Sequence, residues 1–157
     1  MGEHEHKRSG EEHPRSDQIQ IILLFVLIGI WILDSFILNK YTMTFVPLPI
    51  RLSISVALLG IGIYLVQKSH RLVIESDEPG LVDWGVYSIT RHPMYLGSML
   101  FELGIVTTTL SIPALFLCLV LFIAYNQFAA YEENSLFDIL ENDYRDYMKK
   151  VKRWALF

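Results

Sequence analysis

Residues 93–131 have the sequence PMYLGSMLFELGIVTTTLSIPALFLCLVLFIAYNQFAAY, and this stretch decides the fold. Glu102 is its only charged residue, and Pro113 falls near the middle, between two apolar runs. Each run is close to the roughly 20 residues that an α-helix needs to cross the apolar core of a bilayer. We therefore predict two membrane spans, residues 93–112 and 114–131, which form a tight helical hairpin.

Two more apolar blocks precede this hairpin and predict further spans at residues 19–38 and about 51–67. Pro47 and Pro49 break the segment between them. Hydrophobic residues make up 52% of the chain, and their collection into blocks is typical of a membrane protein rather than of a soluble core. The expected fold class is therefore all-α, an integral membrane bundle of about four spans in one domain, residues 18–157.

The first 17 residues are polar, charged and without periodicity, so we predict a disordered tail over residues 1–17. Four spans would place both termini and the connector before residue 93 on one side of the bilayer. Of the 13 Lys and Arg residues, all but Lys40 and Arg51 fall on that side. Because cytosolic loops are enriched in basic residues, we predict that both termini are cytosolic.

Beyond residue 131 the pattern becomes amphipathic, which predicts a helix over about residues 133–152. Apolar residues recur on one face at three- or four-residue spacing: Leu136, Leu140, Tyr144, Tyr147 and Val151. Basic residues crowd the end of this helix, which suits it to an anionic membrane surface. It is equally suited to folding back over the spans as a lid, and the sequence leaves both alternatives open.

Arg91 and His92 stand immediately before Pro93, the expected first residue of a span. The free N–H groups and positive dipole end of a helix N-terminus attract an anion, so a carboxylate or phosphate is one candidate ligand. Tyr87 and Tyr95 flank the pair in the sequence. The alternative is that these side chains only anchor the protein at the membrane interface.

Glu132 and Glu133 follow the last predicted span, near the negative end of its helix dipole, where two carboxylates are unfavourable without a cation. A bound sulfonium or amino group, or Arg91, is a candidate partner; alternatively, both carboxylates are simply solvated. Tyr144 and Tyr147 have aromatic faces that can hold a cation. Their alternative role is to make core contacts of a docked helix.

Glu102 lies nine residues into the third predicted span, about 14 Å deep at helical rise. A carboxyl group at that depth has to face the bundle interior, where it lines a substrate tunnel or makes a structural hydrogen bond. Gly60 and Gly62 in the second span permit the close approach of another helix or a ligand.

The segment from Gly85 to Gly97, GVYSITRHPMYLG, resembles the G-x-Y-x-x-x-R-H-P-x-Y-x-G signature of the isoprenylcysteine carboxyl methyltransferase family. Residues 131–154 resemble that family's tail, E-E-x-x-L followed by Y-x-x-Y-x-x-x-V-x-R. Phospholipid N-methyltransferases look similar in the same places. The likeness covers about Gly60 to Trp154. It departs from the family at Glu141-Asn142-Asp143, where a glycine is usual, which loosens the expected geometry of the tail.

The resemblance implies a multispan helical enzyme that binds S-adenosylmethionine between its last spans and the folded-back tail, without a Rossmann domain. Carried onto this sequence, it implies that the following residues contact the cofactor: Tyr87, His92, Tyr95, Glu132 and Glu133. Tyr144 and Tyr147 would close the pocket, and Arg91 would orient the acceptor or its carboxylate. Arg91 and Glu133 are thus the expected catalytic residues, with Arg91 and Glu102 on the acceptor side.

These features together predict a membrane methyltransferase that acts on the carboxyl group of a lipid-like or prenylated acceptor. One alternative is N-methylation of a phospholipid such as phosphatidylethanolamine, in which the amine must first lose a proton. Two others are an NADPH-dependent enzyme of the steroid-reductase type and a non-catalytic membrane protein. Neither a metal nor a nucleic acid partner is expected.

Overall fold

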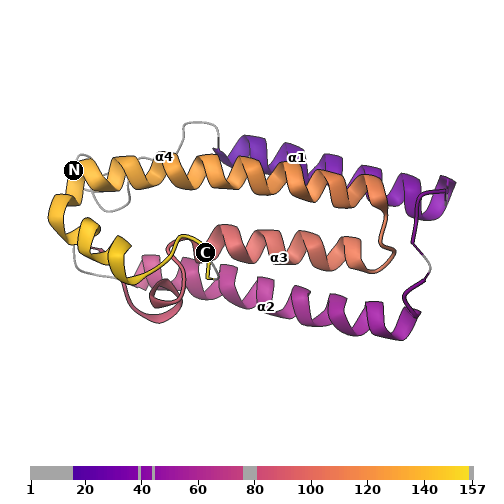
Figure 1. The fold of residues 1–157 in the computed structure, drawn as a ribbon, viewed down its shortest axis with the longest axis horizontal. Coiled ribbons are helices and arrows are strands. Elements are labelled where there is room, and N and C mark those ends of the chain that lie inside the picture. The colour runs from indigo at the N-terminus through magenta and orange to yellow at the C-terminus, as the bar shows by residue number, and fades with distance from the viewer. Residues whose placement is uncertain (1–15, 39, 44, 76–80, 156–157) are drawn as a thin grey trace.

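The computed structural model describes residues 16–38, 40–43, 45–75 and 81–155 (Figure 1). Almost all of the tail predicted to be disordered, residues 1–17, lies outside this range; only its last two residues are described, and they begin the first helix. The elements in chain order are α1 (Ser16–Ile32), η2 (Leu33–Leu38), α2 (Leu48–Glu75), η3 (Gly85–Ser88), α3 (Pro93–Thr107) and α4 (Ile112–Lys150). The described chain has helices and one isolated β-bridge but no strand, which confirms the all-α prediction.

Three helical segments are long and apolar enough to cross a membrane: Gln18–Leu38, Leu48–Ile74 and Ile112–Lys150. The second is longer than predicted at both ends. It begins just after Pro47, whose carbonyl accepts hydrogen bonds from Ile50 and Arg51, and α2 continues to Glu75, well past the predicted end near residue 67. The third predicted span is wrong in length. Helix α3 has 15 residues, about 22 Å at helical rise, which is short of a roughly 30 Å apolar core.

The early end of α3 follows from three consecutive threonines. The hydroxyls of Thr107 and Thr108 donate to the carbonyls of Leu103 and Ile105, each at 2.7 Å, and Leu110 then takes a positive φ of 52°. β-Branched residues fit a helix less well, and side-chain bonds to the backbone compete with its continuation. Ser111 then caps α4, so that helix begins at Ile112 rather than at residue 114.

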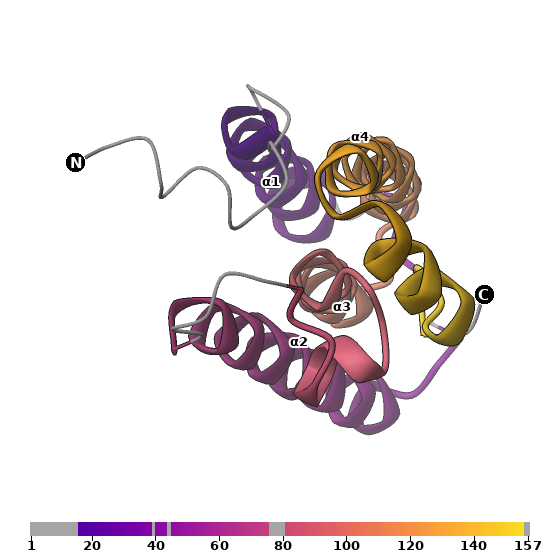
Figure 2. The same cartoon turned by 90° about the vertical axis from the view of Figure 1, so that its left-hand side faces the viewer.

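Helix α4 is the second correction. Residues 114–131 and 133–152 were predicted as a span and a separate tail helix, but α4 runs through Glu132 and Glu133 without a break. The chain bends only at Glu141, which has a φ of 43°. After this bend the last turns fold back beside the bundle, as the yellow segment in Figures 1 and 2 shows. Of the two alternatives for the tail, the structure therefore has the folded-back one.

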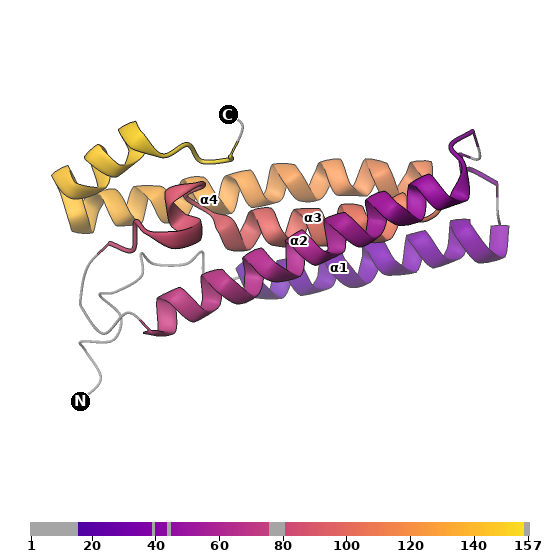
Figure 3. The same ribbon diagram turned by 90° about the horizontal axis from the view of Figure 1, so that it is seen from below.

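Helices α2 and α3 pack most closely of all the helices, and glycines make this possible. A Cβ atom on Gly62 would lie 2.7 Å from the carbonyl oxygen of Gly97, and one on Gly104 would lie 2.9 Å from Leu59 Cγ. A Cβ atom on Gly60 would meet nothing from another helix within 4 Å, so only one member of the predicted glycine pair serves the helix contact. Figure 3 shows α2 crossing α3 obliquely. Helix α1 lies against α4, as Figure 2 shows.

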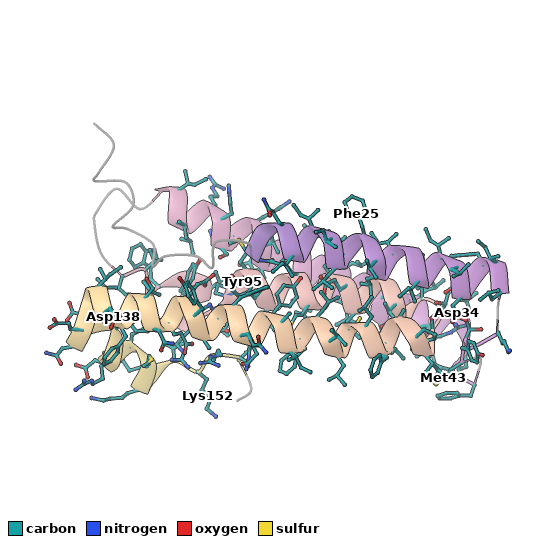
Figure 4. All side chains as sticks on the ribbon, turned by 90° about the horizontal axis from the view of Figure 1, so that it is seen from above. Phe25, Asp34, Met43, Tyr95, Asp138 and Lys152 are labelled. Carbon is teal, nitrogen blue, oxygen red and sulfur yellow. The ribbon has the colours of Figure 1, made fainter. Side chains whose placement is uncertain are left out.

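A polar network ties the helices together at one end of the bundle. The carboxylate of Asp34, which is only 3% exposed, accepts hydrogen bonds from Ser111 Oγ at 2.6 Å and from the Tyr41 backbone N–H at 3.1 Å. Trp31 donates to Thr109 Oγ1 at 2.9 Å. In Figure 4, Asp34 lies at the end opposite Asp138 and Lys152. The sequence motifs therefore gather at the other end of the bundle from this network.

Candidate functional site

Four segments meet where α3 begins: the turn after η3, the first turn of α3, the middle of α4 and the C-terminal segment after α4. The C-terminal segment is held by the Arg91 N–H, which donates to the Lys152 carbonyl at 3.1 Å, and by Thr90 Oγ1, which donates to the Arg153 carbonyl at 2.6 Å. We define the site cluster as the charged and aromatic side chains that these segments bring together: Arg91, His92, Tyr95, Glu132, Glu133 and Arg153.

Glu133 is at the centre of the site cluster and is only 7% exposed. Arg153 donates to it twice, from Nε to Oε1 at 3.0 Å and from Nη2 to Oε2 at 2.5 Å. His92 Nε2 lies 3.1 Å from Oε1, and Arg91 Nη2 lies 3.4 Å from the same oxygen. Glu133 is therefore held by three basic side chains, and the alternative that it is merely solvated is wrong.

These contacts decide the ionisation of Glu133, which lies beyond the apolar part of α4. Burial opposes its negative charge, but hydrogen bonds from His92 and Arg153 and the charge of Arg91 outweigh burial and lower the pKa of Glu133 to about 2. For His92, burial disfavours the charged ring. The hydrogen bonds and charges of Glu132 and Glu133 outweigh that cost and raise the pKa of His92 above its usual value.

Glu132 connects the site cluster to a stack of aromatic rings. Its Oε1 accepts a hydrogen bond from the hydroxyl of Tyr95, and its Oε2 lies 3.4 Å from His92 Nδ1. The Tyr95 ring stacks on His92, at 5.8 Å between centroids, and also on Tyr125, at 5.5 Å. Tyr95 is labelled in Figure 4, where it lies between the helices near the start of α3.

The predicted tyrosines divide into two groups. Tyr144 and Tyr147 pack against each other in the folded-back tail, with ring centroids 5.9 Å apart, and the Tyr147 hydroxyl donates to the Tyr87 carbonyl at 2.7 Å. Burial, followed by the charge of Glu133, raises the pKa of Tyr144. The Tyr87 hydroxyl instead bonds to Ser69 on α2 at 2.7 Å, so the structure ties this ring to α2 rather than to the carboxylates.

Glu102 lies apart from the site cluster and is only 3% exposed. It accepts a hydrogen bond from the Tyr125 hydroxyl at 2.6 Å. Because Tyr125 stacks on Tyr95, which binds Glu132, Glu102 connects to the site cluster through two tyrosine rings. The prediction that Glu102 faces the bundle interior is confirmed.

The sequence did not indicate Asn126 or Trp154 as members of the site, and it did not indicate Arg153 as the partner of Glu133. Asn126 Oδ1 accepts hydrogen bonds from Arg153 Nη1 at 3.0 Å and from Trp154 Nε1 at 3.3 Å. The indole of Trp154 lies 6.2 Å from the ring of His92. An amide within an apolar helix could have indicated Asn126, but nothing in the sequence pairs Arg153 with Glu133.

Two buried polar atoms at this end have no hydrogen-bond partner among the described residues. They are Arg91 Nε and the hydroxyl of Tyr144. Buried polar groups are normally satisfied, so such a pair next to carboxylates and aromatic rings is suited to a polar ligand. Carboxylates and tyrosine faces are partners for a cationic group, while Arg91 is a partner for an anionic one.

Comparison with known proteins identifies a family. The model of the phospholipid methyltransferase family matches residues 50–143, which is more than half of the chain. No curated protein and no solved structure matches the chain significantly. The matched range begins in α2 and includes Arg91, His92 and both glutamates, but it ends before Arg153.

Proposed function

The chain belongs to the phospholipid methyltransferase family, and from this we propose that it uses S-adenosylmethionine to methylate a lipid-like acceptor at the cytosolic face of a bilayer. The family indicates a methyltransferase, and the three long apolar segments indicate a membrane protein. We propose in addition the identity of the cofactor, the class of acceptor and the orientation in the membrane. The NADPH-dependent and non-catalytic alternatives gain no support from the family match.

The observation that carries the proposal is the pair of unpartnered atoms, Arg91 Nε and the Tyr144 hydroxyl, buried beside Glu132 and Glu133. S-Adenosylmethionine has a cationic sulfonium and amino group, a carboxylate and an aromatic base. The site has a group for each: carboxylates for the cations, an arginine for the anion and several rings for stacking. The residues present therefore fit this cofactor.

The residues of the site divide into those that hold the cofactor and those that close over it. When bound, S-adenosylmethionine supplies an electrophilic methyl group. His92, Tyr95, Glu132 and Glu133 hold the cofactor, and the tail with Tyr144 and Tyr147 closes over it and excludes water. Because Arg153 and His92 fix the carboxylate of Glu133, the position of this carboxylate is set before a ligand arrives.

Two acceptor classes remain as proposals. A carboxyl acceptor, as in isoprenylcysteine carboxyl methylation, would use Arg91 to hold its carboxylate in line. In the structure, however, Arg91 Nη2 lies 3.4 Å from Glu133 Oε1, so an acceptor carboxylate would share the Arg91 guanidinium with Glu133. An amine acceptor, as in phospholipid N-methylation, must lose a proton, and Glu102 or Glu132 is available to take it. The family match supports the amine acceptor, and so does the presence of Glu132 beside the already paired Glu133.

The orientation rests on the placement of basic residues. The site lies at the end of the bundle where α2 ends and α3 begins, and among the described residues this side holds every Lys and Arg except Lys40 and Arg51. Since α3 is short, its N-terminus is expected to lie slightly below the membrane surface. A water-soluble cofactor would reach the site from the cytosol, and a lipid from within the bilayer.

The proposal is tested by calorimetric titration of S-adenosylhomocysteine into the detergent-purified full chain. We expect saturable one-to-one binding, and S-adenosylmethionine should compete for the same site. A folded preparation, shown by its helical circular dichroism, that binds neither compound would overturn the proposal. Titration with NADPH in the same cell examines the oxidoreductase alternative.

A further inference from the structure

The end of the chain separates its charges by sign along the sequence. Acidic residues dominate the stretch around the bend in α4, where they occupy four exposed positions: Asp138, Glu141, Asp143 and Asp146. Arg145 is the only basic residue in the range 134–146. Residues 147–155 have the opposite character, with four basic residues and no acidic one. The chain therefore changes from acidic to basic within the folded-back tail.

The bend at Glu141 turns this separation in sequence into a separation in depth. The apolar part of α4, residues 112–131, is about 30 Å long at helical rise, so Glu133 lies near the membrane surface. From Glu133 the helix continues about 12 Å further outward to the bend. The tail then returns, and the ion pair between Arg153 and Glu133 brings its end back to the level of Glu133. The acidic stretch is thus farthest from the membrane and the basic stretch is closest to it.

The figures show the same arrangement. In Figure 4, Asp138 lies near one end of the molecule, whereas Lys152 lies further back along the bundle, toward the level of Tyr95, and extends away from the helices. Figure 2 looks along the bundle and shows the tail outside α3 and α4, on the side away from α1. In a membrane this flank faces lipid, so the basic stretch lies beside the head groups that surround the protein.

The lysines of this stretch are exposed, and we call them the tail lysines: Lys149, Lys150 and Lys152. The apolar side chains between and before them turn inward and form the core of the tail. Lys149 pairs with Asp146 at 2.8 Å, but these side chains are 68% and 64% exposed, so water competes with the pair. Within the described part of the chain, neither Lys150 nor Lys152 forms an ion pair. The tail lysines therefore present positive charge to their surroundings.

Exposed apolar residues beside the tail mark its level as the membrane–water interface. Trp84 and Ile89, on either side of η3, are 50% and 60% exposed. The segment that follows is joined to the tail, because the Arg91 N–H donates to the Lys152 carbonyl at 3.1 Å. Tryptophan is enriched where lipid head groups meet the apolar core of a bilayer. The backbone of Lys152 is thus bonded to a segment suited to that layer.

We propose that the tail lysines form a docking surface for the anionic lipid head groups of the cytosolic leaflet, and that this contact holds the folded-back tail in place. A basic side chain near an anionic membrane gains a favourable interaction that falls off within a Debye length, about 8 Å at physiological salt. The bend at Glu141 lies farther out than this, so the acidic stretch is repelled little. Folding back and membrane contact are therefore compatible in one tail. This inference goes beyond the proposed function and requires no bound cofactor.

Hydrogen exchange of the full chain in lipid nanodiscs tests the proposal. One preparation contains phosphatidylcholine alone, and the other contains phosphatidylcholine with about 30% phosphatidylserine. The exchange of the backbone amides of residues 142–153 is measured in both, without cofactor. We expect at least about fivefold slower exchange with the anionic lipid at low salt, because a lipid that binds only the docked tail lowers the population of its open form. High salt should remove the difference by screening.

Each variant is compared with itself in the two lipids, which cancels any change in the stability of the tail. Replacement of all three tail lysines by glutamine should give equal exchange in both lipids. Replacement of all three by glutamate should reverse the effect, so that the anionic lipid makes exchange faster. Two single variants form a matched pair that each remove one exposed basic residue. Lys152→Gln should reduce the lipid effect, whereas Arg145→Gln, in the acidic stretch, should leave it unchanged.

The outcomes are decisive in both directions. Equal exchange of the wild type in the two lipids overturns the proposal, as does a lipid effect that the triple glutamine variant retains. Inorganic phosphate, added to the neutral nanodiscs at matched ionic strength, should have no effect. Slower exchange with phosphate would indicate a site for a free anion and would also overturn a membrane docking surface. Titration of S-adenosylhomocysteine into the same samples reports separately on the methyltransferase function, so either proposal can fail alone.

Discussion

Arg153 Nη2 lies 2.5 Å from Glu133 Oε2, and the same two side chains form a second bond between Nε and Oε1 at 3.0 Å. This two-point pair fastens the C-terminal segment to the middle of α4. Its side chains are 27% and 8% exposed, so water screens the pair only in part. The pair closes the site from one side and fixes its central carboxylate.

Removal of the arginine should therefore loosen the tail. Arg153→Ala leaves Glu133 with fewer donors, and we expect a loss of about 2 kcal/mol in the free energy of unfolding together with weaker S-adenosylhomocysteine binding. Denaturant unfolding followed by circular dichroism and calorimetry provide the two measurements. Lys149→Ala breaks an exposed pair with Asp146 and serves as the matched control, which should change neither quantity.

The charge of Glu133 should matter more for the ligand than its shape. Glu133→Gln has the same size but no negative charge, and we expect at least about a tenfold loss of S-adenosylhomocysteine affinity. The exposed Asp138 on the same helix gives the control Asp138→Asn, which should bind as the wild type does. Unchanged affinity in Glu133→Gln would place the ligand somewhere else.

The pH dependence of stability should show the contribution of His92. Its pKa is raised in the folded state, so its contribution is fully present below the unfolded pKa of about 6.5 and is lost as the pH rises through the folded pKa. The difference in unfolding free energy between wild type and His92→Gln should thus be larger at pH 6 than at pH 9.

The two glycines of α2 should respond differently to the same substitution. Gly62→Ala places a Cβ atom 2.7 Å from the backbone of Gly97, which forces α2 and α3 apart, and we expect a loss of about 1–3 kcal/mol. Gly60→Ala meets nothing within 4 Å and should be neutral or slightly stabilising, since alanine favours a helix. Denaturant unfolding of both variants distinguishes the positions, and equal effects would contradict the packing.

The bend in α4 provides a last prediction. Glu141 has a φ of 43°, which a residue with a Cβ atom adopts at a cost, so Glu141→Gly should stabilise the chain by about 1 kcal/mol. Asn134→Gly, at an exposed position in the regular part of α4, should instead destabilise it by roughly 0.3 kcal/mol. Denaturant unfolding measures both variants. If both glycines destabilise the protein, the bend is not held at residue 141.

Much of this molecule could be predicted from local sequence. Apolar runs of about 20 residues predict membrane helices because an isolated backbone in lipid has to satisfy its own hydrogen bonds. The Arg91-His92-Pro93 order places two basic groups at a helix N-terminus, because proline is favoured at the first position of a helix. The depth of Glu102 follows from helical rise and needs no knowledge of its neighbours.

The end of α3, the bend in α4 and the contacts between distant segments could not be predicted from local sequence. Helix α3 ends early, because the side-chain bonds of Thr107 and Thr108 to the backbone compete with the helix that hydrophobic periodicity predicts. The bend in α4 lies at Glu141, well beyond the break predicted after residue 131, because the docked tail rather than the end of the apolar run decides where the chain turns.

From the sequence alone, Arg153 is compatible with contact to an anionic membrane surface, and Asn126 is a single amide in an apolar run with no indicated partner. The sequence alone determined the helices and the kinds of side chain at their ends. Only the tertiary structure decided the partners, because the folded-back tail brings Arg153 to a glutamate 20 residues earlier, where burial makes a paired charge far more favourable than a lone one.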